Sequence, residues 1–282
     1  MKIKIVFDST IMYTPEEAEK FNVGITPFII VINNESYKDM VDIDYKTFYE
    51  KLDEGIEVST SQPNVADTIA LFENILTEYD HIIYFTLPEQ LSGTYNAGKL
   101  AAREVSEEKI TVVDIATGVG ASRTLALNVN KMIEENKTVE EIVEYSKSLK
   151  YNSKLYVVVR DTKQLRKSGR FSNMAASIFT MIKLKLALTL KTDGLMDKFS
   201  ISRSEAKLLK EIVDDAQNMN FTEQNSRVYI AHANVLDKAK ELEKRIKDVY
   251  PNIEVEYMPF PPTLGAHSGA GSYAAHFTKK DW

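Results

Sequence analysis

The chain contains no cysteine and only four histidines among its 282 residues. The absence of cysteine excludes disulfide bonds, iron–sulfur clusters and thiol catalysis. The histidines show neither the H-x-x-x-H nor the H-x-E spacing that is typical of metal ligands; they are His81, His232, His267 and His276. We therefore expect neither a metal nor another cofactor.

The chain also lacks an excess of positive charge and long apolar runs. Its formal net charge is −6, so it offers no overall electrostatic attraction to nucleic acid or anionic membranes. Apolar runs such as "ITPFIIVI" are shorter than the roughly 20 residues that cross a bilayer. The start, "MKIKIVFDST", has no small-residue cleavage site and is interpreted as a strand rather than a signal peptide. We expect a cytoplasmic protein without a transmembrane segment or nucleic-acid partner.

Three familiar catalytic motifs are absent or incomplete. No G-x-x-x-x-G-K-[ST] phosphate loop occurs, and "EQLSGTY" around Ser92 lacks the G-x-S-x-G turn of serine hydrolases. Asp8 ends the first predicted strand, as the nucleophile of aspartyl-phosphate phosphatases does. Those enzymes carry a second aspartate two residues later, where this chain has Thr10. The sequence therefore disfavours all three enzyme classes.

Residues 1–152 alternate short β-branched runs with amphipathic stretches. Strands separated by helices at this spacing predict a parallel sheet with helices on both faces. The predicted strands cover 2–9, 25–32, 81–87 and 109–115, and the predicted helices cover 15–21, 45–55, 64–79, 94–105 and 120–150.

The pattern changes after residue 152. Asp193 and Gly194 separate two strand-like runs within 186–202, which is a hairpin signal. Further strands are predicted at 153–161, 227–233 and 253–260, and further helices at 204–218 and 235–249. Hairpin and crossover signals together predict a mixed sheet. We expect an α/β protein of two domains, with a parallel-sheet domain at 1–152 and a mixed-sheet α/β domain at 153–282.

Two hydroxyl-rich segments are candidates for binding an anion. "STSQP" places Thr60 and Ser61 just before a predicted helix, and "LSGTY" places Ser92 between a strand and a helix. Helix capping alone would explain Ser61. Helix N-termini also favour negative charge, and both segments are expected on the same side of one sheet. The resulting hypothesis is a carboxylate or phosphate held by Thr60 and Ser92.

Three later segments each allow a structural and a functional interpretation. "QLRKSGRFS" is either a solvated basic turn or the source of a guanidinium for a buried carboxylate. The apolar run 175–190 by itself indicates ordinary core packing. "LGAHSGAGSYAAHF" at 264–277 contains His267 and His276 among three glycines. We interpret its first part as a flexible loop at a ligand and its second part as packing.

In their order, "FDST", "TSQP", "LSGTY", "LRKSGR" and "LGAHSGAGS" resemble the DegV family of bacterial fatty-acid-binding proteins, over residues 2–277. The resemblance implies a non-catalytic protein that holds one long-chain fatty acid, such as palmitate, stearate or oleate. It places the carboxyl group between two domains and the acyl chain in a tunnel of the second. Several members are similar to the carrier subunit of fatty acid kinase, which makes an ATP-binding kinase subunit an implied partner.

The resemblance also implies roles for individual residues. The candidates for binding the carboxylate are Thr60, Ser61, Ser92, Gly93, Thr94, Arg170 and His267. The candidates for lining the acyl tunnel are Ile178, Phe179, Met181, Ile182, Leu186 and Leu188. The chain departs from the family pattern at Ala270, where proline is usual, and at Pro88, where serine is usual. The segment after the hairpin, normally basic, keeps Arg203 and Lys207 around Glu205.

Two alternatives to a carrier remain open. One is an enzyme acting on a small carboxylated or phosphorylated metabolite between the domains, with Asp8 and His267 as catalytic groups. The other is a regulatory protein that responds to a fatty acid. A carrier needs a long apolar tunnel, whereas a small-metabolite enzyme needs a polar cleft. Burying sixteen carbons at about 0.8 kcal/mol each would supply on the order of 10 kcal/mol before binding entropy is subtracted.

Overall fold

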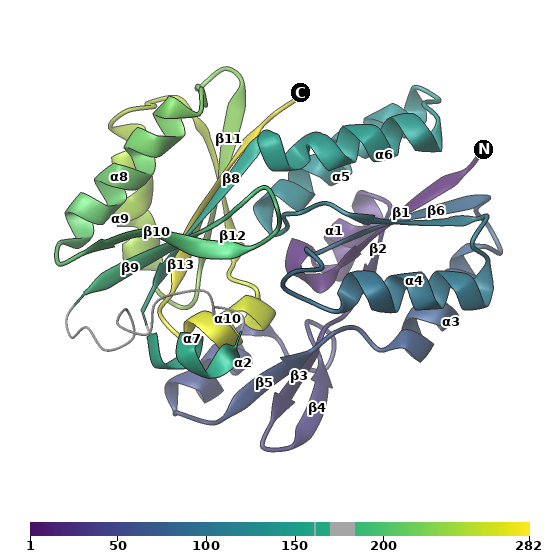
Figure 1. Cartoon of the computed structure of the whole chain (residues 1–282), viewed down its shortest axis with the longest axis horizontal. Coiled ribbons are helices and arrows are strands. Elements are labelled where there is room, and N and C mark those ends of the chain that lie inside the picture. The colour runs from purple at the N-terminus through teal and green to yellow at the C-terminus, as the bar shows by residue number, and fades with distance from the viewer. Residues whose placement is uncertain (161, 170–183) are drawn as a thin grey trace.

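The N-terminal region, residues 1–152, is built on a parallel sheet. The computed structural model describes residues 1–160, 162–169 and 184–282 (Figure 1). The four strands lie in the order β2-β1-β6-β7, with bounds β1 (Ile3–Asp8), β2 (Val23–Thr26), β6 (His81–Thr86) and β7 (Ile110–Asp114). The helices around them are α1 (Pro15–Lys20), α3 (Val65–Ile75), α4 (Thr94–Val105), α5 (Gly120–Glu134) and α6 (Val139–Lys147).

Alternation along β1 explains why this sheet has helices on both faces. Ile5 and Phe7 pack in one buried cluster with Leu125 of α5, whereas Val6 packs in another with Phe72 of α3 and Ala101 of α4. Successive side chains of a strand point to opposite faces, so an apolar residue at every position requires a cover on each side. The predicted parallel sheet with two helical layers is confirmed.

A small antiparallel sheet, which the sequence analysis missed, lies below the parallel sheet in Figure 1. Its strands are β3 (Ile29–Ile32), β4 (Glu35–Lys38) and β5 (Val58–Ser61), in the order β4-β3-β5, with α2 (Tyr45–Asp53) between β4 and β5. The expectation of one strand over 25–32 was wrong, because the chain leaves the first sheet at Pro27 and enters the second at Ile29. Asn33 and Asn34 both have positive φ, as a tight type I′ hairpin requires.

The C-terminal region, residues 153–282, contains a six-stranded mixed sheet in the order β10-β9-β8-β13-β11-β12. Its strands are β8 (Ser153–Val159), β9 (Lys185–Leu190), β10 (Met196–Ser202), β11 (Ser226–His232), β12 (Glu254–Pro259) and β13 (Tyr273–Lys279). Its described helices are α7 (Thr162–Ser168), α8 (Glu205–Asn218), α9 (Leu236–Lys247) and α10 (Pro262–Ser268). β11 and β12 pair in parallel and the other neighbours are antiparallel, which confirms the mixed sheet and the β9–β10 hairpin.

The first part of the glycine-rich segment 264–277 is not the flexible loop that we expected. Pro262 occupies the start of α10, where its missing N–H costs nothing, and the helix ends at Gly269, whose φ of 85° favours glycine. The following "SYAAHF" enters β13, which lies between β8 and β11 inside the sheet. The helix therefore gives His267 a fixed position, which a loop would not.

The first turn of α5 joins the two regions. A Cβ on Gly120 would lie 2.4 Å from Cβ of Tyr229 on β11, so only glycine allows this approach. The backbone N–H of Ala121 donates to Nδ1 of His276 at 3.3 Å, and Oγ1 of Thr124 lies 2.9 Å from the hydroxyl of Tyr229. Burial lowers the pKa of His276 to about 3, so its imidazole is neutral and accepts this hydrogen bond.

We expect acid to weaken the fold through His276. The pKa of a histidine in the unfolded chain is about 6.5, so the stability that the buried neutral ring contributes is fully present above that pH. It is lost progressively as the pH falls from about 6.5 towards 3, because the unfolded state then binds the proton more strongly. Urea unfolding of the wild type at pH 7.5, 6.5, 5.5 and 4.5 should show this loss.

His276→Asn is the matched variant, because its amide oxygen can accept from Ala121 without titrating. As the pH falls, the free energy of unfolding of the wild type should decrease more than that of H276N. A constant difference across this range would contradict the assignment.

Candidate functional site

A pocket of about 200 Å³ lies between the two regions. Its apolar wall comes from both of them and consists of Phe28, Leu87, Leu91, Val157, Leu188, Met196, Phe260 and Leu264. Its polar lining consists of Thr60, Ser61, Gln62, Ser92, Gly93, Thr263, His267 and Ser268. An apolar cavity with a few polar groups is typical of a small-molecule site.

Thr60 and His267 form one polar part of this pocket. Thr60 belongs to β5 and His267 to α10, and Oγ1 of Thr60 lies 3.1 Å from Nε2 of His267. The two residues are more than 200 positions apart in the sequence, and α10 packs against both β5 and α2. Hydroxyl and imidazole groups are both able to donate a hydrogen bond to an anion.

Ser92 and Gly93 form another polar part, at the start of α4. Oγ of Ser92 lies 2.7 Å from Oγ1 of Thr94 and accepts a hydrogen bond from the backbone N–H of Thr94 at 3.3 Å. A Cβ on Gly93 would lie 1.9 Å from Oε1 of Gln62, so glycine lets the Gln62 side chain approach the backbone here. The helix N-terminus next to this hydroxyl favours a negative charge.

The structure brings most of the predicted carboxylate residues together. Thr60, Ser61, Ser92, Gly93 and His267 all line the pocket. Thr94 is fully buried and contacts Ser92 rather than the cavity. Arg170 lies outside the described residues.

The predicted tunnel residues are only partly described. Leu188 lines the pocket, and Leu186 is buried in the hydrophobic cluster that surrounds it. The other four tunnel candidates lie outside the described residues: Ile178, Phe179, Met181 and Ile182.

Thr60 and Ser61 line the pocket, although their expected place in the fold was wrong. Thr60 and Ser61 lie in β5 of the small antiparallel sheet, not in a loop after the parallel sheet. Asn64, rather than Ser61, caps α3, because its side-chain oxygen accepts from the backbone N–H groups of Ala66 and Asp67. Thr60 and Ser92 therefore reach the same pocket from two different sheets.

Sequence reasoning missed Ser268 and Thr263, which reach the pocket from α10. Oγ of Ser268 is buried and has no hydrogen-bond partner among the described residues. A buried hydroxyl without a partner is costly, so this group is available to a ligand in the pocket that it lines. Its place directly after His267 was the only signal in the sequence, and the segment was expected to be a loop.

The buried carboxyl group of Asp8 is fully used by its own surroundings. It accepts hydrogen bonds from the hydroxyl and the backbone N–H of Thr10, and from the backbone N–H of Leu87 at 2.7 Å. Burial raises its pKa. Asp8 does not line the pocket that contains His267, so the structure does not bring together the two groups of the enzyme alternative.

A second buried carboxyl group, that of Asp39, connects the N-terminal region to α10. Its Oδ2 accepts from Oγ of Ser9 at 2.8 Å and from Oγ1 of Thr263 at 3.1 Å. The backbone N–H of Phe28 in turn donates to Oγ of Ser9. Burial raises the pKa of Asp39 to about 7. Through these bonds Asp39 holds two residues of the pocket lining, Phe28 and Thr263.

A polar cavity of about 610 Å³ adjoins the pocket. The two cavities share Thr60 and His267, and the polar one is also lined by Asn33, Asn34 and Lys167. The Thr60–His267 pair therefore lies where an apolar cavity meets a polar one. Among the described residues, no cluster of three potential ligands could hold a metal ion, and no helix is long and apolar enough to cross a membrane.

Comparison with known proteins identifies relatives along nearly the whole chain. The sequence model of the DegV family, described as "Uncharacterised protein, DegV family", matches residues 2–280. A DegV domain-containing protein of Clostridium acetobutylicum is 30% identical over 277 residues, which cover 96% of both chains.

Two solved structures share the fold closely. DegV from Bacillus subtilis, a fatty acid binding protein, superposes with a TM-score of 0.85 at 26% identity, covering 99% of both chains. A Thermotoga maritima protein, whose structure revealed a fatty acid binding function, superposes with a TM-score of 0.86 at 25% identity, again covering 99% of both chains.

Replacing each of the two buried carboxyl groups by a neutral amide should have different effects on the stability of the fold. In Asp39→Asn the amide oxygen can keep the bonds from Ser9 and Thr263, and the NH₂ group takes the place of an oxygen that has no partner among the described residues. In Asp8→Asn one of two accepting oxygens becomes a donor that faces other donors. We expect D39N to be tolerated and D8N to cost about 1–3 kcal/mol at pH 7, measured by urea unfolding.

The ionisation of Asp39 should make the stability of the wild type depend on pH. Its pKa is higher in the folded chain than in the unfolded one, so its stabilising contribution is complete below about pH 3.9 and declines as the pH rises towards 7. The stability of D39N relative to wild type should therefore increase between pH 4 and pH 7. If the difference in the free energy of unfolding between D39N and wild type stayed constant over this pH range, the raised pKa of Asp39 would be contradicted.

Proposed function

The chain belongs to the DegV family, and we propose that it binds one long-chain fatty acid in the pocket between its two regions. The carboxylate lies at the hydroxyl-lined part, and the acyl chain follows the apolar wall. The observation that carries this proposal is the convergence of Thr60, Ser92 and His267, from three segments far apart in the sequence, on one pocket with an apolar wall. The fatty-acid-binding relatives from Bacillus subtilis and Thermotoga maritima support it.

The donors around the pocket suit a carboxylate. An anion that enters an apolar cavity loses its hydration and needs hydrogen bonds in return. The hydroxyls of Thr60, Ser92 and Ser268 and the imidazole of His267 can supply them. We include Arg170 as a further partner of the carboxylate or of His267, and the tunnel candidates between 178 and 182 as a further part of the acyl site. The two sheet regions are proposed as separate domains that meet at residue 152.

We propose that the protein is a non-catalytic carrier that acts in the cytoplasm. Support comes from the apolar character of the wall and from the position of Asp8, whose carboxylate is satisfied away from the pocket. Tight retention is expected, because burying an acyl chain of sixteen carbons contributes on the order of 10 kcal/mol before entropy is subtracted.

A second proposal, presentation of the acid to an ATP-binding kinase subunit, is favoured by the polar cavity. Thr60 and His267 face both cavities, so the carboxyl group would lie beside a polar space large enough for a reacting group of a partner. The lining of the polar cavity includes Glu57 and Lys167 besides the two asparagines, a mixture that suits a polar group. The test combines this chain with a purified kinase subunit and ATP. Acyl phosphate should form only when this chain is loaded with oleate.

The protein purified from cells should carry a fatty acid. Organic extraction followed by mass spectrometry should find close to one long-chain acid per chain, and added palmitate or oleate should raise the melting temperature of delipidated protein because ligand binds only the folded state. A lipid-free protein whose melting temperature is unchanged by either acid would contradict the proposal.

Removing two of the hydroxyls should weaken binding without unfolding the protein. Thr60→Ala combined with Ser92→Ala deletes two donors to a charged acceptor, each worth about 1.5 kcal/mol or more, so affinity should fall roughly 100-fold. Displacement of a fluorescent fatty acid measures this change. Ser59→Ala, on the same strand but outside the pocket lining, is the control and should bind like the wild type. Unchanged affinity in the double variant would place the carboxylate elsewhere.

A further inference from the structure

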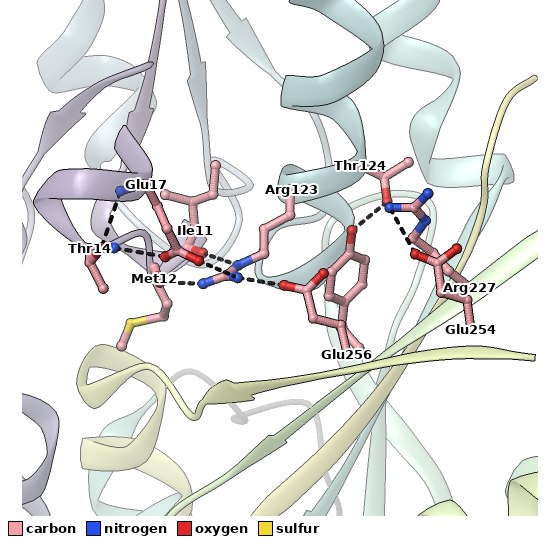
Figure 2. A network of polar contacts seen from close by, with 10 residues as sticks. Ile11, Met12, Thr14, Glu17, Arg123, Thr124, Arg227, Glu254 and Glu256 are labelled. Carbon is pink, nitrogen blue, oxygen red and sulfur yellow. Dashed lines mark hydrogen bonds and ion pairs between the residues drawn. The ribbon is translucent and has the colours of Figure 1, made fainter. Parts of the chain in front are cut away.

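Arg123 is a buried arginine in the first turn of α5, and its guanidinium contacts several residues (Figure 2). Its Nε donates to the carbonyl oxygen of Ile11 at 3.0 Å, and its Nη2 donates to that of Met12. Its Nη1 lies 3.4 Å from Oε1 of Glu17 and 2.6 Å from Oε1 of Glu256. The guanidinium thus contacts two carboxylates and two backbone carbonyls at once.

Only one of these four partners comes from the C-terminal region. Glu256 lies on β12, whereas Ile11, Met12 and Glu17 all belong to the N-terminal region. Arg123 is 6% exposed and Glu256 is 41% exposed, so the pair lies at the edge of the buried contact. Loss of Glu256 would leave the guanidinium bonded to its other partners. Replacing this one carboxylate with a neutral amide therefore removes the ion pair between Arg123 and the C-terminal region and preserves the contacts of Arg123 within the N-terminal region.

The contact matters for the pocket because the pocket has a wall on each region. Phe28 and Leu87 line it from the N-terminal region, and Val157 and Phe260 line it from the C-terminal region. A movement that separated the two regions near α5 would move these two walls apart. Arg123 also holds the turn next to Ser9, whose hydroxyl binds Asp39.

We propose that Arg123 is a positioning residue that, through Glu256, holds the two regions closed over the pocket and so limits the rate at which a bound fatty acid leaves. That the bound ligand is a fatty acid rests on the proposed function. That this ion pair holds the two regions closed does not depend on it. Because the pair is partly buried and its arginine keeps its other partners, its loss should raise dissociation about three- to tenfold.

Glu254 provides a matched control on the same strand. It lies two residues before Glu256, on the same face of β12, and is 48% exposed. Its partners are Nη1 of Arg227 at 3.5 Å and Nζ of Lys280 at 3.5 Å, both in the C-terminal region (Figure 2 shows Arg227). Glu254→Gln therefore removes ion pairs from the same strand and leaves the Arg123–Glu256 ion pair intact.

The first experiment measures the rate at which a fluorescent fatty acid, cis-parinaric acid, leaves the wild type, E256Q and E254Q. Excess oleate displaces it in a stopped-flow instrument, and unfolding midpoints are measured in parallel. E256Q should release the probe about three- to tenfold faster than wild type, and E254Q within about twofold of it. Equal rates in E256Q and E254Q, at similar unfolding midpoints, would overturn the proposal.

The second experiment measures the closure without any ligand. The chain has no cysteine, so Leu100→Cys on α4 and Val249→Cys after α9, both at exposed positions, give two unique spin-label sites, one in each region. Pulsed electron spin resonance should give a narrow distance distribution in the wild-type and E254Q backgrounds and a broader or longer one with E256Q. Identical distributions in all three would overturn the closure. If the wild type did not bind cis-parinaric acid, the proposed fatty-acid ligand would be contradicted, but the closure of the two regions would not.

Discussion

The contact between the first turn of α5 and the C-terminal sheet is the constraint on which the pocket depends. Gly120 allows the helix to approach Tyr229, and His276 stays neutral so that it can accept from the backbone of Ala121. Arg123 extends the same contact to β12. Without this docking, the walls of the pocket would belong to two separate surfaces exposed to water, and the apolar surface on each would lose its cover.

The opposite side of the pocket is organised by α10. The helix places His267 beside Thr60 and binds Asp39 through Thr263. Its neighbour Ser268 keeps a buried hydroxyl without a partner among the described residues, which fits a site that a ligand completes. Two contacts, one at α5 and one at α10, thus arrange apolar and polar groups around a single cavity, and the proposed fatty acid satisfies both kinds of lining.

Much of the fold could be predicted from local pattern, and the errors have identifiable physical causes. Helices such as α4, α5 and α8 were predicted because their apolar periodicity is strong and they pack against a sheet along their length. The small sheet was missed because β4 and β5 are short and mostly polar. The last helix was interpreted as a loop because glycine lowers helix propensity, whereas packing against α2 and β5 stabilises it in the structure.

The α/β class, the parallel and mixed sheets, and the residue types that suit a carboxylate could be predicted from the amino-acid sequence, because they follow from periodicity and local chemistry. Motifs that resemble those of a family also made Thr60, Ser92 and His267 candidates for the site. The folded chain was needed to see that these three residues line one pocket and that Asp8 does not line it. It was also needed to see the contacts of Ser268, Asp39 and Arg123 around the pocket. Such relations depend on contacts between residues more than 200 positions apart, and no local pattern encodes them.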